Sequence, residues 1–304
     1  MSDIVISPAF GYASEDVAVF LRSARAHMPD VPVLLLRAGR DRTFEAKVTA
    51  MHPNARVWVP PMAAVHEAGR ALLTRGPLES VWSFTLQRLA DRLGPFAPAT
   101  LRTLPFCLSY VFARHFYHVQ LLQEIADTTE AVLLADVRDV VFEGDIFKHL
   151  GEGLLMGAEP QRMRDSAWNM RSMLRIRTDE DVMHLLDKQV LCAGVILGSL
   201  AHVQAYVKAM IQEIAANLRH VAMRKGDQGI HNLVVWTERV GLPIEVSVNG
   251  KGPIWTIGLL DDTDLGRLGL NGKHESPDHH APAIIHQYDR HPQLNQLYAE
   301  KYGE

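Results

Sequence analysis

The sequence has little cysteine, no long hydrophobic run and no excess of charge of one sign. Its 304 residues include two cysteines, Cys107 and Cys192, which are too few for a disulfide scaffold and fit a reducing compartment. No stretch approaches the ~20 apolar residues of a transmembrane helix, and the first residues lack the pattern of a secretory signal. The formal net charge of −4 provides no electrostatic attraction for nucleic acid. We therefore expect a cytoplasmic protein with no membrane span and no nucleic-acid partner.

Several common catalytic and nucleotide-binding motifs are also missing. No Gly-x-Gly-x-x-Gly follows the first predicted strand, which argues against a dinucleotide-binding Rossmann domain. The chain contains no Walker A lysine loop, no Gly-x-Ser-x-Gly and no His-Glu-x-x-His. These absences argue against a P-loop NTPase, an α/β-hydrolase and a zinc protease of the familiar kinds.

The hydrophobic residues that are present follow an alternation of strands and helices. The predicted strands cover residues 4–6, 31–36, 56–59, 131–135, 154–158, 191–197 and 283–285. The predicted helices cover residues 17–24, 63–93 (broken at 76–77), 108–125, 203–218 and 230–235. This alternation predicts one α/β domain over residues 1–304, with a mostly parallel central sheet flanked by helices. Residues 258–282, rich in glycine and polar side chains, are predicted to form a mobile loop.

The most informative motif is a pair of carboxylates that follows a buried strand. Residues 131–135 are entirely apolar, which is typical of a central parallel strand, and Asp136 and Asp139 come directly after them. Open α/β sheets bind ligands where such strands end, and carboxylate oxygens suit Mg²⁺ or Mn²⁺. The two carboxylates reach one site only if the chain turns, because in an extended strand they point to opposite faces. The alternative is that Asp136 caps a turn and Asp139 pairs with Arg138.

Four segments together resemble the GT-A-fold glycosyltransferases, most closely the family 8 nucleotide-sugar transferases, which include glycogenin and lipopolysaccharide galactosyltransferases. That family carries an Asp-x-Asp motif after a strand, an Asn-Ala-Gly-Val strand, an Asp-Gln pair that opens a helix, and a late histidine. The matching segments are Asp136-Val137-Arg138-Asp139, Cys192-Ala193-Gly194-Val195, Asp227-Gln228 and Ile285-His286. The resemblance covers most of the chain and implies a GT-A-like fold.

The resemblance also implies roles for individual residues. The metal ion, Mn²⁺ or Mg²⁺, would be held by Asp136, Asp139 and His286. The catalytic pair would be Asp227 and Gln228, although Asp227 also suits the N-cap of the helix that follows it. The nucleotide-sugar would contact Phe10, Tyr12, Arg114, Arg138, Cys192 and Gly194. For Tyr12 the alternative to stacking on uracil is packing in a turn, and for Arg114 it is a cation on a helix surface.

Two residues depart from the family pattern. Arg138 stands where the second aspartate of Asp-x-Asp would be, so Asp139 must supply that ligand or the site has fewer carboxylates. An arginine in this place could instead contact the diphosphate, because its planar fork of donors matches phosphate oxygens. Cys192 replaces the usual asparagine near the donor sugar.

These observations predict a metal-assisted glycosyltransferase. The expected donor is a nucleoside-diphosphate sugar, UDP-linked, the acceptor is a hydroxyl of a saccharide or small molecule, and the resemblance implies retention of anomeric configuration. One alternative is a metal-dependent phosphoester or pyrophosphate hydrolase that uses the same carboxylates. Another is a degenerate sugar-nucleotide binder without catalysis, for which Arg138 and Cys192 are the motivation.

Overall fold

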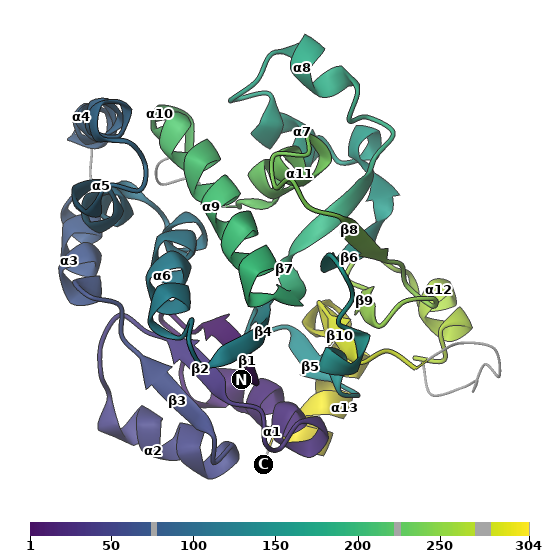
Figure 1. Ribbon diagram of the computed structural model, residues 1–304. Helices are drawn as coiled ribbons and strands as arrows, with labels where there is room; N and C mark the ends of the chain where they lie inside the picture. The colour runs from purple at the N-terminus through teal and green to yellow at the C-terminus, as the bar shows by residue number, and fades with distance from the viewer. Residues whose placement is uncertain (74–77, 222–225, 271–280, 304) are drawn as a thin grey trace.

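The computed structural model describes residues 1–73, 78–221, 226–270 and 281–303, and a seven-stranded sheet forms its centre (Figure 1). The strands lie in the order β3-β2-β1-β4-β7-β6-β8. Their bounds are Ser2–Pro8 (β1), Val33–Leu36 (β2), Ala55–Trp58 (β3), Thr129–Ala135 (β4), Leu154–Arg162 (β6), Gln189–Ser199 (β7) and Ile244–Ser247 (β8). Four of the six neighbouring pairs are parallel, which confirms the predicted α/β class with a mostly parallel sheet.

A smaller sheet stands beside the first and has the order β5-β10-β9. Its strands are Val140–Phe142 (β5), Ile284–His286 (β10) and Ile254–Thr256 (β9). Strand β5 follows β4 after a short bend, so the two sheets are joined at the place where the predicted carboxylates lie.

Strand β4 is central, as predicted, but it is parallel only to β1 and antiparallel to β7. The prediction of a central parallel strand therefore holds on the β1 side and is wrong on the β7 side. An apolar run such as residues 131–135 indicates that both faces of the strand are buried. It does not indicate whether the neighbouring strands run parallel or antiparallel to it. Val132 and Leu134 pack into one hydrophobic core, whereas Ala131 and Leu133 pack into the other, because successive side chains of a strand alternate between faces.

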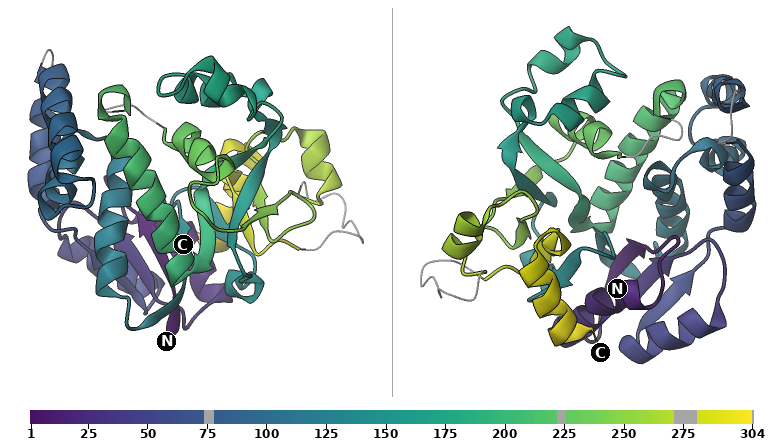
Figure 2. Two further views of the ribbon diagram at one scale, coloured as in Figure 1. Left: turned by 45° about the horizontal axis from the view of Figure 1, so that its top comes forward. Right: turned by 180° about the vertical axis from the view of Figure 1, so that it is seen from behind.

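Helices cover both faces of the large sheet (Figure 2). On one face lie α6, α9 and α11, and on the other lie α1 and α2. Their bounds are Tyr110–Glu124 (α6), Leu200–Ala216 (α9), Gln228–Trp236 (α11), Ala18–His27 (α1) and Arg42–Met51 (α2). The second helix, α2, is not among the predicted elements, whereas the other four are.

The remaining helices lie at the edges of this core. They are Ala63–Leu73 (α3), Leu78–Leu93 (α4), Pro98–Thr103 (α5), Ala167–Met173 (α7), Asp179–Met183 (α8), Leu218–Val221 (α10), Asp262–Arg267 (α12) and Pro292–Tyr302 (α13). The prediction of two helices within residues 63–93 is confirmed by α3 and α4, while the predicted break at residues 76–77 lies outside the described residues. The predicted loop 258–282 is wrong in part because it contains α12, which the side chain of Asp261 caps; residues 271–280 lie outside the described part.

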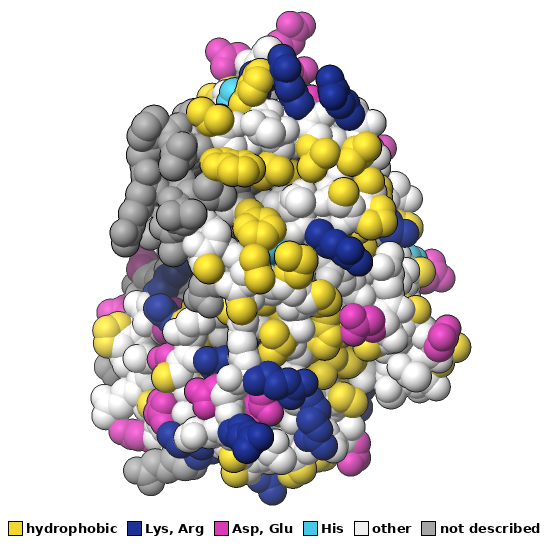
Figure 3. Space-filling model, turned by 90° about the vertical axis from the view of Figure 1, so that its left-hand side faces the viewer, with side chains coloured by type: hydrophobic (Ala, Val, Ile, Leu, Met, Phe, Trp, Pro, Cys, Tyr) yellow, Lys and Arg dark blue, Asp and Glu magenta, His cyan; other side chains and the backbone are white. Residues whose placement is uncertain are grey.

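Helices α3, α4 and α5 form the side of the molecule seen in Figure 3, where hydrophobic side chains gather. Val81, Trp82 and Phe84 of α4 are exposed, while Ser83 and Gln87 of the same helix are buried. Within the described residues, none of the helices has both the length and the apolar character that crossing a membrane requires.

Candidate active site

The backbone after β4 turns in the way that a shared site for both carboxylates requires. Strand β4 ends at Ala135, residues 137–139 form a bend, and β5 begins at Val140. Strand β5 pairs antiparallel with β10, which places Val140 opposite His286. The backbone N–H of Gln287 donates to the carbonyl oxygen of Asp139 at 2.7 Å, so His286 is held beside Asp139.

Asp136, Asp139 and His286 form a cluster whose geometry suits a metal ion. One ligand atom from each residue lies within 4.8 Å of the others. His286 Nε2 is 3.5 Å from Asp139 Oδ1, and neither ring nitrogen of this buried side chain forms a hydrogen bond with a described residue. The buried imidazole has no hydrogen-bond partner and lies next to two carboxylates. Together the three side chains form a set of ligands that fits Mg²⁺ or Mn²⁺.

The alternative roles for these carboxylates are not what the structure shows. Arg138 pairs with Asp289, with Nη2 and Oδ2 2.7 Å apart, and not with Asp139. Asp136 pairs with Arg114, and its carboxylate is not a turn cap. The Arg138 side chain is exposed and lines the same cleft as Asp136.

The cluster has opposing effects on the acidity of its members. The surrounding protein desolvates Asp136 and raises its pKa; Asp139 adds to this, and Arg114 opposes it. Burial would raise the pKa of Asp139, but the charges of His286 and Arg290 outweigh it and the pKa is lowered. For His286, burial lowers the pKa, whereas Cys192 and Asp139 raise it more strongly, so the net shift is well upward.

Because Gly194 has no side chain, it leaves space for the side chains of this cluster. It lies on β7, where its carbonyl accepts from the backbone N–H of Asp136 at 2.8 Å. A Cβ atom at this position would lie 2.5 Å from His286 Cε1 and 2.8 Å from Asp136 Oδ2. Such distances are far below van der Waals contact, so any larger residue would push the histidine or the carboxylate away.

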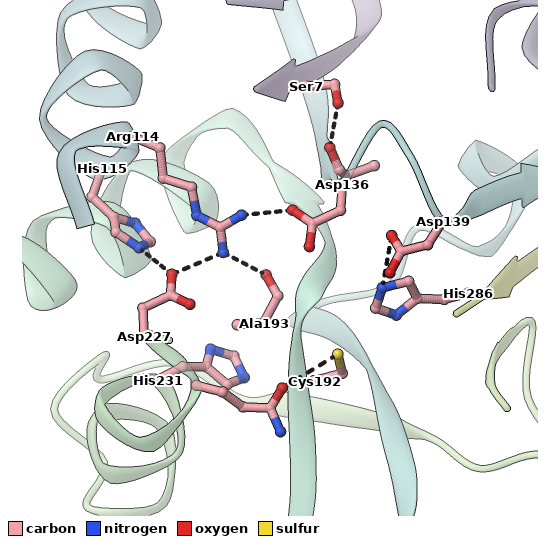
Figure 4. Close-up of polar contacts among 12 residues, drawn as sticks. Ser7, Arg114, His115, Asp136, Asp139, Cys192, Ala193, Asp227, His231 and His286 are labelled. Atoms are coloured by element: carbon pink, nitrogen blue, oxygen red, sulfur yellow. Dashed lines mark hydrogen bonds and ion pairs between the residues drawn. The ribbon is translucent and has the colours of Figure 1, made fainter. Parts of the chain in front are cut away.

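Arg114 of α6 connects Asp136 to Asp227, as Figure 4 shows. Its Nη1 donates to Asp136 Oδ1 at 2.6 Å, and its Nη2 donates to Asp227 Oδ2 at 2.8 Å. The guanidinium is buried, which excludes the surface-cation interpretation of Arg114. Burial lowers the pKa of Arg114, but the two carboxylates raise it more, so the arginine stays charged.

Asp227 is held ionised by the same network. It stands at the N-cap position of α11, but its side chain makes no capping hydrogen bond, so the predicted capping role is wrong. Its carboxylate instead accepts from Arg114 and from His115 Nε2 at 3.1 Å. Burial would raise the pKa of Asp227, but Arg114 and His115 lower it far below its usual range. Burial lowers the pKa of His115, so this neighbour is neutral.

A cleft of about 320 Å³ opens in front of these side chains. It is lined by Pro8, Phe10, Tyr12, Tyr110, Val111, Arg114, Asp136, Val137, Arg138, Asp139 and Asp227. Phe10 stacks on Tyr110, with ring centroids 4.6 Å apart, and Tyr12 is half-buried. The cleft thus has an aromatic side, formed from the end of β1 and the start of α6, and a charged side at the end of β4.

The other predicted site residues lie just behind this cleft. Gln228 Oε1 is 3.6 Å from Cys192 Sγ, and Gln287 Nε2 is 3.5 Å from the same sulfur. Gln228 Nε2 donates to Glu159 Oε1 at 2.9 Å. Cys192 and Gln228 therefore touch each other, and the structure brings together all the site residues that the sequence predicts around one end of the sheet.

His115, Tyr110 and Glu159 also belong to this site, although the sequence does not predict them as site residues. Arg114 and His115, together with His118, interrupt the apolar stripe of α6, and this interruption is a signal for buried polar groups. Glu159 stands at the end of the apolar part of β6, in the same way that Asp136 follows β4. The pattern of an acidic residue after an apolar run therefore also points to Glu159. No local sequence pattern marks Tyr110. Its place in the site comes from stacking on Phe10, which is distant from it in the sequence.

Two solved structures of the galactosyltransferase LgtC are similar to this chain. One is an active-site mutant in which glutamate replaces glutamine; it aligns with a TM-score of 0.55 and 17% identity, over 98% of this chain and 94% of that one. The other, in complex with donor and acceptor sugar analogs, aligns with a TM-score of 0.53 and 17% identity, over 98% and 95%. No family model and no curated protein matches the sequence. The chain has the GT-A fold of LgtC, which confirms the predicted fold.

Proposed function

We propose that this protein transfers a sugar from a nucleoside-diphosphate donor to a hydroxyl group of an acceptor. The observation that carries the proposal is the Asp136, Asp139 and His286 cluster at the mouth of a cleft in a GT-A fold. A diphosphate is the ligand that needs a divalent cation and an arginine side by side, because it carries several negative charges. LgtC, which has this fold, was solved with donor and acceptor sugar analogs, and this supports the same pair of ligands here.

The three cluster residues would hold Mn²⁺ or Mg²⁺. The bound cation supplies Lewis-acid neutralisation of the charge that develops on the leaving diphosphate. The Asp136 side chain is 37% exposed and lines the cleft, and its Oδ1 atom accepts from Arg114. Arg138, exposed beside the cluster, is placed to exchange Asp289 for a phosphate oxygen.

The aromatic side of the cleft would bind the nucleoside. Tyr12 is the ring that we propose stacks on the base, which we take to be uracil. Phe10 already stacks on Tyr110, so it would form the wall behind the nucleoside rather than a second free face. Cys192 and Gly194 lie on β7 below the cluster, where the donor sugar would pass.

Asp227 and Gln228 would form the catalytic pair. The buried ion pair with Arg114 keeps the Asp227 carboxylate charged, so it can accept a hydrogen bond from a sugar or acceptor hydroxyl. The amide of Gln228 is oriented by Glu159 and Cys192. We propose retention of configuration on the resemblance to family 8.

Thermal melting with UDP, GDP, CDP and ADP, each with and without Mn²⁺, tests the donor site. A ligand that binds the native state at a hundredfold excess over its Kd stabilises it by about 2.7 kcal/mol. We expect one diphosphate to raise the Tm, and to raise it more with Mn²⁺. The absence of a shift with all four nucleotides would contradict the proposal.

Asp136→Ala tests the catalytic assignment. Because Arg114 keeps Asp227 as a partner, we expect this variant to fold and to lose metal-dependent donor turnover. Full activity in the variant would remove Asp136 from the site. Cleavage of UDP-sugars at a rate that no acceptor changes would favour the hydrolase alternative, and UDP binding without turnover of any donor would favour the degenerate binder.

A further inference from the structure

A small cavity lies next to the nucleotide cleft and is lined by residues of α6, α9, β4 and β7. Arg114 and Asp136 line both spaces, so their side chains form the wall between the cavity and the cleft. The cavity has a volume of about 10 Å³, which is close to the space that one water molecule needs. This size excludes a sugar, a phosphate or any larger ligand.

Three of the side chains that line this cavity carry nitrogen atoms without a hydrogen-bond partner among the described residues. These atoms are Arg114 Nε, His115 Nδ1 and both ring nitrogens of His118. The side chains are buried, because Arg114 is 8% exposed, His115 1% and His118 2%. Buried polar atoms in native proteins are nearly all hydrogen-bonded, either to protein or to ordered water, so we expect a partner for these nitrogens.

The neighbouring groups decide which of these atoms donate and which accept. Burial lowers the pKa of His115 and of His118, so both rings are neutral. His115 Nε2 carries the proton of its ring, because it donates to the carboxylate of Asp227, which only accepts. His115 Nδ1 is therefore an acceptor. Arg114 Nε is a donor, and the neutral His118 has one donor and one acceptor nitrogen.

Tyr206 of α9 adds a hydroxyl group to the same cavity. The ring centroid of Tyr206 lies 6.2 Å from that of His115, which in turn lies 6.1 Å from that of His118. The Tyr206 Oη atom is 2.9 Å from Nδ1 of His231, a buried residue of α11. A hydroxyl group both donates and accepts, so Oη can form a second hydrogen bond while it bonds His231.

We propose that this cavity binds a single water molecule. The water accepts from Arg114 Nε and from the N–H group of His118. It donates to His115 Nδ1 and to Tyr206 Oη, whose own proton points to His231. Two donors and two acceptors around one space match the four hydrogen bonds that a water molecule can form. An anion would meet the lone pair of His115, and a cation would meet the charge of Arg114, so neither fits this set of groups.

The bound water fixes the His115 ring and, through it, the carboxylate of Asp227. Both hydrogen bonds that this carboxylate accepts from described residues, from Arg114 and from His115, end on Oδ2 (Figure 4). Oδ1 is the oxygen left for a ligand in the nucleotide cleft, which Asp227 lines. His115 and His118 are therefore positioning residues for Asp227. This positioning role rests on the proposed function, in which Asp227 contacts a sugar, whereas the water site does not.

A crystal structure of the full chain, at a resolution that shows ordered water, tests the site directly. We expect one density peak at about 2.7–3.2 Å from each of four groups, which are Arg114 Nε, a ring nitrogen of His118, His115 Nδ1 and Tyr206 Oη. A cavity without such a peak, or one closed by direct hydrogen bonds among these groups, would contradict the water site. An anomalous signal at this position after a bromide soak would identify an anion and would also contradict it.

Two substitutions of His118 test the positioning role, with release of UDP from UDP-galactose or UDP-glucose in the presence of Mn²⁺ as the measured activity. His118→Phe keeps a ring of similar volume but removes both nitrogens, so we expect kcat to fall about tenfold while the KM for the donor stays unchanged. His118→Gln retains an N–H group and should recover most of the kcat. His52→Phe is the matched control, because His52 is also fully buried but lies at the end of α2, outside both spaces, and it should keep the kcat of the wild type. A wild-type kcat in His118→Phe, or a kcat in His118→Gln as low as that of His118→Phe, would contradict the positioning role.

The melting shift caused by UDP and Mn²⁺ separates this proposal from the proposed function. His118 does not line the nucleotide cleft, so the shift in His118→Phe should equal that of the wild type. Loss of the shift in this variant would contradict the positioning role, because donor binding would then be damaged as well. A water in the crystal structure, together with no UDP shift and no turnover in the wild type, would support the water site. The same result would contradict the proposed function and, with it, the positioning role.

Discussion

Replacement of Arg114 by methionine should destabilise the fold by about 3–5 kcal/mol, because it leaves a buried carboxylate without its cation. Arg114 is 8% exposed and Asp227 is 5% exposed, and the two side chains are 2.8 Å apart. Methionine fills similar space, so the loss is electrostatic and not a matter of packing. Asp136 adds little to this number, since it is 37% exposed and water screens its charge after the arginine is removed.

Urea unfolding followed by circular dichroism measures this loss of unfolding free energy, and thermal melting measures the matching change in Tm. For a chain of this length a change of 1 kcal/mol moves the Tm by about 2 °C, so a drop of about 6–10 °C is expected. Arg88→Met is the control, because Arg88 lies on exposed α4 with its guanidinium 4.6 Å from the Phe84 ring centroid. That variant should change stability by less than about 0.5 kcal/mol.

The pH dependence gives a second check of the same reasoning. Burial raises the pKa of Asp227, but Arg114 and His115 lower it more, so the folded-state pKa is depressed. Stability from this pair is then fully present above the unfolded pKa of about 4 and is lost as the pH falls through the folded-state pKa. The difference between wild type and Arg114→Met should be largest at neutral pH and should shrink in acid. A loss no larger than that of Arg88→Met at neutral pH would refute the argument.

The remaining predictions concern the metal cluster. Gly194→Ala should weaken Mn²⁺ binding, measured by titration calorimetry, by about tenfold or more, because the new Cβ would lie 2.5 Å from His286 Cε1. Gly39→Ala, with no atom within 4 Å of the added Cβ, should bind as the wild type does. Burial lowers the pKa of His286 but Cys192 and Asp139 raise it further, so a metal ion must displace a proton. Mn²⁺ affinity should therefore rise with pH, by up to about tenfold per unit below that pKa, and His286→Asn should flatten the rise.

The elements of the fold and the two carboxylates after β4 could be read from local patterns. The apolar run before Asp136 marks β4, and the apolar run from Leu191 to Leu197 marks β7. The condition that the chain must turn between Asp136 and Asp139 is met, and the turn is made by three residues. These features depend on residues that are close in the sequence, so periodicity and spacing are enough to find them. His286 lies far along the chain, and the resemblance to family 8 was what assigned it to the metal cluster.

The cleft lined by Glu159, Trp168 and Gln228 could not be found in this way. Trp168 and Gly226 are far apart in the sequence, and their contact depends on the packing of α7 against the segment before α11. Glu159 appears in the sequence as one acid at the end of a strand. Its importance comes from the amides around it, which arrive from α11 and from β6 itself.

The sequence by itself determined the α/β class, the approximate positions of seven strands and the presence of acidic groups where β4 ends, because hydrophobic periodicity acts over a few residues. Only the tertiary structure decided which partner each charged group has. Arg114 could have been a surface cation, and Asp227 could have capped a helix, but α6 and α11 bring the two together against Asp136. Local sequence spacing is compatible with several partners for a charged side chain. Burial favours the pairing in which no charge is left unpaired in a low-dielectric environment.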